Sequence, residues 1–233
     1  MRASPFAAAL AAALATLAAP AAPARAQDVA GPPGAVTVSG VVAIVSDYRF
    51  RGLSRSDRDW AVQGSIRLDH RSGLYLATWA SSIDPVAGAG SEIDVFGGWS
   101  GNVDGWKPDI GLYSYLYPGG DGLAYFEIYG ALTREFGPVS ATVGLNHAPD
   151  QGNTRRSSTY VYGRAGVGLP GTPVALRAGI GHENGAFARR KLDWTLGATA
   201  TIGRLNLGLA YVDTDQRFRP GAAGVVLSIG TAF

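Results

Sequence analysis

The chain has 233 residues, 46% of them hydrophobic and only 16% charged, which is enough for one folded domain but not for two. It contains no cysteine, which excludes a disulfide framework and a thiolate metal site. Its 20 basic residues include Arg2 and Arg25, which lie in a segment that we expect to be removed, so 18 basic residues remain against 18 acidic ones. A neutral mature chain does not support the basic surface of a nucleic-acid-binding protein.

The N-terminal segment has the pattern of a secretory signal. A basic residue precedes an apolar run over residues 6–19, and a small-residue cleavage site of the A-x-A type ends at Ala26. The run is shorter than the roughly 20 apolar residues of a transmembrane helix, and prolines follow it. We expect residues 1–26 to be a cleaved signal peptide, residues 27–35 to be a short periplasmic segment, and residues 36–233 to form the folded domain.

From residue 36 onward the sequence divides into segments of strand length, each close to the roughly 9 to 11 residues that cross a bilayer on a tilt. They cover residues 36–50, 60–70, 74–83, 92–100, 107–117, 123–135, 139–147, 159–169, 173–182, 192–202, 204–213 and 223–233. In the eleventh, Leu205, Leu207 and Leu209 alternate with small or polar residues. Because a soluble β-sandwich shows the same alternation with its faces reversed, periodicity alone leaves both folds open.

The connections between these segments differ in length on the two sides. Those after the second, sixth, eighth and tenth segments are tight, such as residues 71–73 and 136–138, whereas those after odd-numbered segments are longer, such as residues 84–91 and 183–191. Short turns on one rim and long loops on the other are typical of outer-membrane barrels, whose short turns are periplasmic. The sequence therefore predicts an all-β fold, an antiparallel up-and-down transmembrane β-barrel of about 12 strands over residues 36–233.

Aromatic residues gather near both ends of the predicted strands. Tyrosine and tryptophan favour the headgroup layer of a membrane because their rings are apolar and their tips are polar. We therefore expect two interface girdles, although aromatic residues favour strands in any case. The long-loop girdle would contain Tyr48, Phe50, Trp60, Tyr115, Tyr117, Tyr125, Tyr160 and Tyr211, and the short-turn girdle Tyr75, Trp99, Trp106, Phe136 and Phe233.

The last predicted strand ends on an aromatic residue. Phe233, Ile229 and Leu227 share one face, and the opposite face carries small residues such as Gly230 and Ser228. This arrangement resembles the closing strand of bacterial outer-membrane barrels, whose terminal aromatic is read by the barrel-assembly machinery. We expect Phe233, Ile229 and Leu227 to form a C-terminal assembly signal, while a half-buried strand of a soluble protein would show the same alternation.

A motif near the N-terminal end of the domain carries a resemblance to a known family. Residues 46–52 (SDYRFRG), followed by Ser54, resemble the N-terminal signature of the TorF-like family of Gram-negative porins. Residues 72–75, 79–84 and 125–129 continue the match, which is close over roughly the first half of the chain. The resemblance implies an outer-membrane β-barrel of about this strand number and a transport role with no named substrate.

Charged residues occupy many predicted inward positions, where a charge is tolerated only if it is paired or hydrated. One hypothesis is a constriction that selects solutes by charge, and the other is a paired arginine–carboxylate network that packs the lumen and blocks flow. Acidic residues outnumber basic ones at these positions, which favours a weak preference for cations. The candidate pore-lining residues are Asp47, Arg49, Arg51, Arg67, Asp69, Glu92, Asp94, Glu127, Glu135, Arg164 and Arg177.

Basic residues also gather in the predicted long loops. They could contact lipopolysaccharide phosphates, which arginine suits well, or they could be solubilising loop charge. They are Arg55, Arg58, Arg155, Arg156, Arg189, Arg190, Lys191, Arg217 and Arg219.

Signals for an enzyme are weak. His147 lies near Asp150, but no serine lies in a nucleophile elbow and the histidine spacing fits no metal site. Residues 166–171 match G-x-G-x-x-G, yet a strand follows and not a helix, so they predict a turn. We expect no cofactor, metal or nucleic-acid partner. The favoured function is an outer-membrane porin-like channel for passive diffusion of small hydrophilic solutes or ions. The alternatives are a non-conducting structural or adhesive barrel that binds lipopolysaccharide or a surface partner, and a barrel hydrolase.

Overall fold

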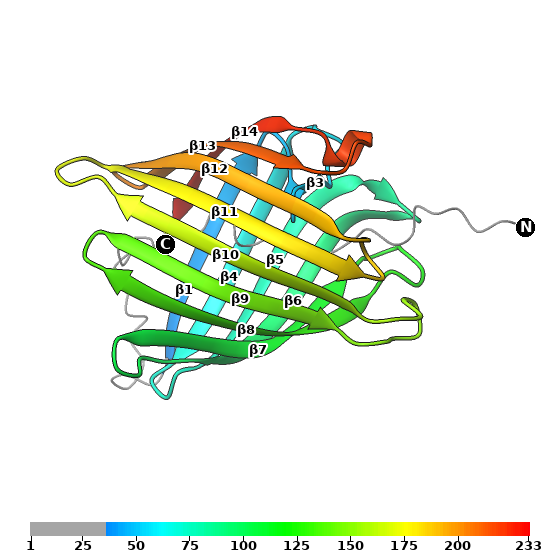
Figure 1. Cartoon of the computed structure of the whole chain (residues 1–233), viewed down its shortest axis with the longest axis horizontal. Helices are drawn as coiled ribbons and strands as arrows, with labels where there is room; N and C mark the ends of the chain where they lie inside the picture. The colour runs from blue at the N-terminus through cyan, green and yellow to red at the C-terminus, as the bar shows by residue number, and fades with distance from the viewer. Residues whose placement is uncertain (1–35) are drawn as a thin grey trace, which may run out of the picture.

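The computed structural model describes residues 36–233, which form one closed barrel of twelve antiparallel strands (Figure 1). The strands of the barrel wall are β1 (Val36–Val45), β4 (Ala61–His70), β5 (Leu74–Val86), β6 (Ala89–Ser100), β7 (Trp106–Leu116), β8 (Tyr125–Phe136), β9 (Val139–Ala148), β10 (Ser158–Gly168), β11 (Val174–Gly185), β12 (Lys191–Ile202), β13 (Leu205–Thr214) and β14 (Gly224–Ala232). Each strand pairs with the next along the chain, and β1 pairs with β14 to close the ring. The predicted barrel of about twelve strands is confirmed. The expected signal peptide (residues 1–26) and periplasmic segment (residues 27–35) lie outside the described residues.

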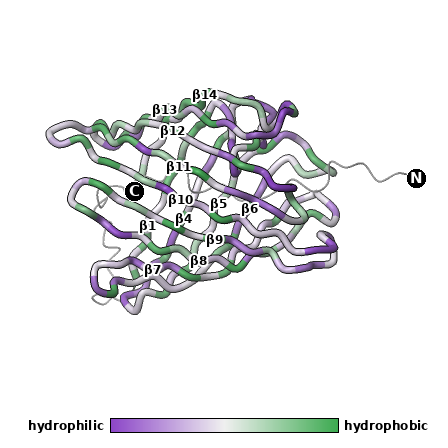
Figure 2. The backbone as a smooth tube through the Cα atoms, in the orientation of Figure 1, coloured by the Kyte–Doolittle hydropathy of each residue, from purple (hydrophilic) through white to green (hydrophobic). Residues whose placement is uncertain are grey.

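Polar and apolar residues are sorted in the opposite sense to a soluble protein. Large apolar side chains are exposed around the outer wall, where Leu196 and Val143 keep 64% and 62% of their surface accessible. Charged side chains such as Glu92, Glu127 and Lys191 are fully buried inside the barrel. Figure 2 shows the resulting alternation of hydrophobic and hydrophilic residues along the strands. A soluble sandwich would bury the first set and expose the second, so this sorting excludes it.

In residues 36–233 no helix is long and apolar enough to cross a membrane.

One connection is tighter than the sequence predicted. Residues 84–91 were expected to form a long loop, but β5 and β6 continue to a two-residue turn in which Ala87 and Gly88 have φ of 49° and 92°. Asp104 and Gly105 form a similar turn, with φ of 50° and 79°. Positive φ at both central positions gives a turn whose twist matches that of the flanking strands, so a long apparent loop contracts into a hairpin.

The prediction of a long-loop aromatic girdle is wrong for most of its members. Trp60 and Tyr211 are exposed on the outside, but the other six are buried inside the barrel, because they fall on inward-facing positions or on the segment before β4. The buried ones are Tyr48, Phe50, Tyr115, Tyr117, Tyr125 and Tyr160. At the short-turn rim Tyr75 is also buried, whereas Trp106, Phe136 and Phe233 are exposed.

The end of the chain seals the barrel. The backbone of Phe233 exchanges two hydrogen bonds with Gly40 of β1, at 2.9 and 3.0 Å. The phenyl ring lies over Gly40, where any larger residue would overlap it. Leu227 and Ile229 are exposed on the outer wall. The apolar face of the last strand therefore points away from the lumen, where lipid or another protein can contact it.

Candidate functional site

The loop between β1 and β4 folds into the barrel and not over its rim. Residues 46–56, called here the inward hairpin, pair β2 (Arg49–Phe50) with β3 (Leu53–Ser54). Its turn is formed by Arg51 and Gly52, with φ of 44° and 82°, and all of its residues from Asp47 to Ser56 are buried. The prediction that the first strand continues through Phe50 is therefore wrong, because β1 ends at Val45 and the chain turns inward.

The tip of the inward hairpin reaches the opposite wall of the barrel. The Arg51 guanidinium donates from Nη2 to Glu127 Oε2 at 2.7 Å and from Nη1 to Glu183 Oε1 at 2.6 Å. These carboxylates come from β8 and β11, far from β1 and β4 in the order of strands around the ring. The guanidinium also lies over the ring of Tyr160, 4.4 Å from its centre. A single side chain thus joins the hairpin to two distant strands.

A lysine completes this buried ion cluster. Lys191 Nζ lies 3.3 Å from Glu183 Oε2 and 3.1 Å from Asp193 Oδ2, and it donates to the backbone carbonyl of Arg51. Burial alone would lower the pKa of Arg51, but Glu127 and Glu183 outweigh it and raise that pKa above its ordinary value. The paired charges satisfy one another, which is the condition under which ions persist inside a protein.

The base of the inward hairpin is also tied to the wall. Arg49 Nε donates to Asp47 Oδ2 at 2.5 Å, and its Nη1 donates to the carbonyl oxygens of Gly52 at 3.0 Å and Ala222 at 2.9 Å. Ala222 precedes β14, after the short 3₁₀ turn η2 (Arg219–Gly221). The hairpin is therefore held at its base by loop backbone and at its tip by side chains.

Aromatic rings fill the space around the inward hairpin. The ring centres of Tyr48 and Trp79 lie 5.2 Å apart, and Tyr115 stacks on Tyr125 with ring centres 4.4 Å apart. Tyr48 also donates to Glu92, a fully buried carboxylate of β6. Rings and hairpin together pack the half of the lumen nearest the long loops.

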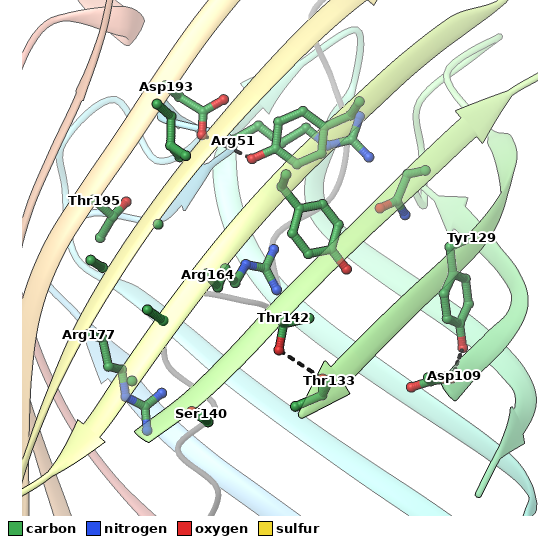
Figure 3. A pocket seen from close by; sticks show the side chains of 18 of the residues that line it. Arg51, Asp109, Tyr129, Thr133, Ser140, Thr142, Arg164, Arg177, Asp193 and Thr195 are labelled. Atoms are coloured by element: carbon green, nitrogen blue, oxygen red, sulfur yellow. Dashed lines mark hydrogen bonds between the residues drawn. The ribbon is translucent and has the colours of Figure 1, made fainter. Parts of the chain in front are cut away.

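The half of the lumen nearest the short turns is hollow. A cavity of about 450 Å³ extends from Arg51 at the hairpin tip to Glu135 near the short-turn end of β8. Figure 3 shows its lining: Arg164 and Arg177 point into it beside the hydroxyl groups of neighbouring strands. Thr133 and Thr142 share a hydrogen bond of 2.8 Å at this wall. We call this space the lower cavity.

The facing wall of the lower cavity combines an arginine, a carboxylate and two tyrosines. Arg67 pairs with Asp69 at 2.8 Å and lies over the ring of Tyr75. The hydroxyl of Tyr75 donates to Asp109 at 2.6 Å and also contacts the hydroxyl of Tyr129. The charged groups of this wall are therefore paired or hydrogen-bonded with one another.

The structure places all eleven candidate pore-lining residues inside the barrel, but in different surroundings. Asp47, Arg49 and Arg51 lie on the inward hairpin and not on a strand of the barrel wall. The others lie on inward-facing strand positions: Glu92, Asp94 and Glu127 in the packed half, and Arg67, Asp69, Glu135, Arg164 and Arg177 in the hollow half. Whether any of them lines a conducting pore is a separate question.

Sequence reasoning misplaced two basic residues and overlooked several tyrosines. Lys191 and Arg55 were predicted on the exposed loop rim, but both are buried in the lumen. Lys191 is the first residue of β12 and shares its inward face with Asp193, so its alternation pattern could have located it. Tyr75 and Tyr129 were not candidates for the site, although both lie two residues along a strand from other inward positions.

The postulated hydrolase pair does not form. His147 lies on β9 between two inward-facing positions. Its Nδ1 forms a hydrogen bond of 2.9 Å with the hydroxyl of Thr159 and not with Asp150. Within residues 36–233 no group of three or more His, Asp or Glu side chains is placed to hold a metal ion.

The chain matches one protein family and shares its fold with several solved structures. A family model described as "Bacterial protein of unknown function (Gcw_chp)" matches residues 29–226, and no curated protein matches the sequence. Among solved structures, the KdgM porin aligns with a TM-score of 0.58 at 6% identity, over 84% of this chain and 97% of its own. The NanC porin aligns at 0.56 and 10% identity, over 84% and 99%. An outer-membrane channel from Pseudomonas putida F1 aligns at 0.51 and 14% identity, over 88% and 97%. At these identities the likeness shows a shared barrel fold.

Proposed function

The chain belongs to the Gcw_chp family of bacterial proteins of unknown function, and from that premise we propose that it is an outer-membrane porin-like channel for small hydrophilic solutes. In this proposal residues 1–26 direct export, and the face with Phe233, Ile229 and Leu227 directs insertion by the barrel-assembly machinery. The resemblance of residues 46–52 to TorF-like porins supports the same assignment and stays a prediction.

The observation that carries the proposal is a polar cavity inside a barrel with an apolar exterior. An exposed apolar wall is stable in lipid and unstable in water, and a closed barrel leaves no unpaired strand edge in the bilayer. The lower cavity, at about 450 Å³, lies within the range of about 300 to 1,000 Å³ that accommodates small molecules. Its charged and hydroxyl lining suits hydrated solutes.

We infer that the inward hairpin closes the described conformation. It occupies the packed half of the lumen, so passage requires it to move. Within the hairpin, β2 and β3 share only two paired positions, and its tip is held by the side chain of Arg51 and by Lys191, which donates to the Arg51 carbonyl. Segments held by few backbone bonds open more readily than the barrel wall that surrounds them. We therefore propose a channel whose first loop is its gate.

A planar-bilayer experiment tests this function with a variant that the register suggests. Val45 and Ala61 are paired across β1 and β4, so residues 46–60 can be replaced by a two-residue Asn-Gly turn without displacing either strand. This variant, called here the hairpin-less barrel, should show steady single-channel steps. The full-length chain should show mostly closed records with brief openings. A folded hairpin-less barrel that is silent at every voltage contradicts the proposal.

The packed half of the lumen also favours a second function, a non-conducting structural barrel. Under this alternative the full-length protein never opens, even though the hairpin-less barrel conducts. The exposed loop arginines would then be the working surface, in contact with lipopolysaccharide phosphates. They are Arg58, Arg155, Arg156, Arg189, Arg190, Arg217 and Arg219. Full-length records without openings, together with binding to lipopolysaccharide that is lost when these arginines are replaced, would favour it.

A further inference from the structure

Charge is distributed unevenly along the lumen. The buried carboxylates Glu92, Asp94 and Glu127 belong to the packed half, where the inward hairpin and tyrosine hydroxyls bind or cover them. Three arginines of the lower cavity, Arg49, Arg51 and Arg67, are paired with carboxylates that do not line it. The other charged residues of its lining are Arg164, Arg177, Asp109, Glu135 and Asp193. Most of the acidic residues on which the predicted preference for cations was based therefore lie in the packed half.

The carboxylates of the lower cavity already have donors of their own. Glu135 pairs with Lys107 at 2.7 Å, and Asp193 pairs with Lys191 at 3.1 Å. Asp109 accepts hydrogen bonds from Tyr75 and Tyr129. None of the three forms an ion pair with an arginine of the opposite wall in the described part of the chain. The charge of Arg164, on that wall, is left to face the cavity.

The surroundings of Arg164 indicate what its charge can bind. It projects from β10, lies over the ring of Tyr162 at 4.0 Å, and forms no ion pair with a carboxylate of residues 36–233. A guanidinium in a partly desolvated cavity is stable only if water or an anion completes its hydrogen bonds. The aromatic contact fixes one face of the group and leaves its N–H edge free to donate.

The neighbours of Arg164 are small or carry hydroxyl groups. Across the strands it is paired with Thr142 on β9 and with Gly179 on β11. Arg177 is paired with Gly166, so the two arginines lie on one face at diagonal positions of adjacent strands. Diagonal positions of this kind lie about 7 to 8 Å apart, within reach of one bound group for side chains as long as arginine. Figure 3 shows the Arg164 guanidinium beside Thr142 and the Arg177 guanidinium beside Ser140, both on the inner side of the barrel.

We propose that Arg164 and Arg177, with the hydroxyl groups of Thr142 and Ser140, form a binding site for the oxyanion group of a small organic or inorganic anion. Arginine presents parallel N–H donors that match carboxylate, phosphate and sulfate oxygens, and hydroxyl groups donate to the remaining oxygens. The glycines opposite the two arginines leave room for the ligand where side chains would otherwise cover them. This inference deepens the proposed function by naming a substrate class, but binding does not require the channel to open.

Binding is tested by NMR on the full-length protein in detergent micelles. The arginine Nε–H signals of Arg164 and Arg177 are assigned by their loss in Arg164→Gln and Arg177→Gln, and phosphate, succinate and neutral 1,4-butanediol are titrated in turn. Phosphate and succinate should shift the Arg164 signal saturably, and butanediol should not. Arg164→Gln should weaken binding, read at Arg177, at least tenfold, and Arg164→Lys should weaken it less.

Arg189→Gln, which removes an exposed loop arginine with the same charge, is the matched control and should leave binding unchanged. Heat-modifiable gel migration shows that each variant is folded. The inference is overturned if neither anion shifts the Arg164 signal, or if Arg189→Gln weakens binding as much as Arg164→Gln.

Reversal potentials of the hairpin-less barrel separate this inference from the proposed function. Preference for chloride over potassium that decreases in Arg164→Gln supports the anion site. A conducting barrel with clear cation preference and no saturable anion shift leaves the channel intact and overturns the site. A silent barrel whose Arg164 signal still shifts with phosphate contradicts the channel and supports the site.

Discussion

The contact on which the closed state most depends is the pairing of Arg51 with two carboxylates, and its removal gives a quantitative prediction. Arg51→Ala deletes three hydrogen bonds, two to Glu127 at 2.7 and 2.9 Å and one to Glu183 at 2.6 Å. Removing one partner of a buried ion pair costs about 3 to 5 kcal/mol, because the other charge remains buried without a partner. In Arg51→Ala, Lys191 still pairs with Glu183, and the Tyr115 hydroxyl still donates to Glu127. We therefore expect a cost at the lower end of this range, about 3 kcal/mol.

The cost falls on the closed state alone, because water can hydrate Glu127 once the inward hairpin has left. About 3 kcal/mol corresponds to roughly a hundredfold change in an equilibrium constant. The open fraction of Arg51→Ala in single-channel records should therefore rise by about two orders of magnitude over the wild-type protein. Arg51→Lys keeps the charge but loses the paired N–H donors, and it should give an intermediate value.

Arg189→Ala is the matched control, since it also removes an arginine, but an exposed one of the loop between β11 and β12. It should leave the open fraction unchanged. If Arg51→Ala and Arg189→Ala gave the same open fraction as the wild-type protein, the assignment of Arg51 as the contact that holds the gate would be refuted.

Three further predictions concern the wall and its assembly. Gly111→Ala would bring a methyl group against the Gly97 carbonyl and the Tyr129 ring, so it should lower the free energy of unfolding in urea by about 1 to 3 kcal/mol. Gly168→Ala, where the added methyl group meets open space, should leave that free energy unchanged. Equal effects of the two substitutions would count against the packing described. Leu196→Arg on the outer wall should cost about 2 to 4 kcal/mol for folding into lipid vesicles if that position lies near the bilayer midplane, and a cost near zero would place it outside lipid. Deletion of Phe233 should slow insertion by the barrel-assembly machinery, while insertion at the wild-type rate would show that the signal lies elsewhere.

The barrel itself was predictable because its evidence is local. Strand length, period-two alternation and the contrast between short turns and long loops are all read within about ten residues, and they gave twelve strands. Where positive φ was needed, as at Ala87, the sequence did not reveal a hairpin, since alanine rarely adopts that conformation. Inward charges on strands were found by the same alternation, as for Glu127 and Arg164.

The inward hairpin was not predictable, because its position depends on contacts between distant residues. Arg51 is 76 residues from Glu127 and 132 from Glu183 in the sequence. The alternation of residues 46–52 looks like the end of a strand, and nothing local indicates that the chain enters the lumen. Without the hairpin, the packed and hollow halves could not be distinguished, and buried Tyr115 and Tyr125 were taken for residues of a membrane girdle.

The most direct test of the account is the conductance of the hairpin-less barrel in a planar bilayer, recorded beside the full-length protein. The account predicts long-lived open steps for the variant and mostly closed records for the full-length chain, because the inward hairpin occupies the centre of the ion cluster and of the aromatic rings in the packed half. Equal conductance of the two proteins, or silence of a variant that is shown to be folded, would contradict it.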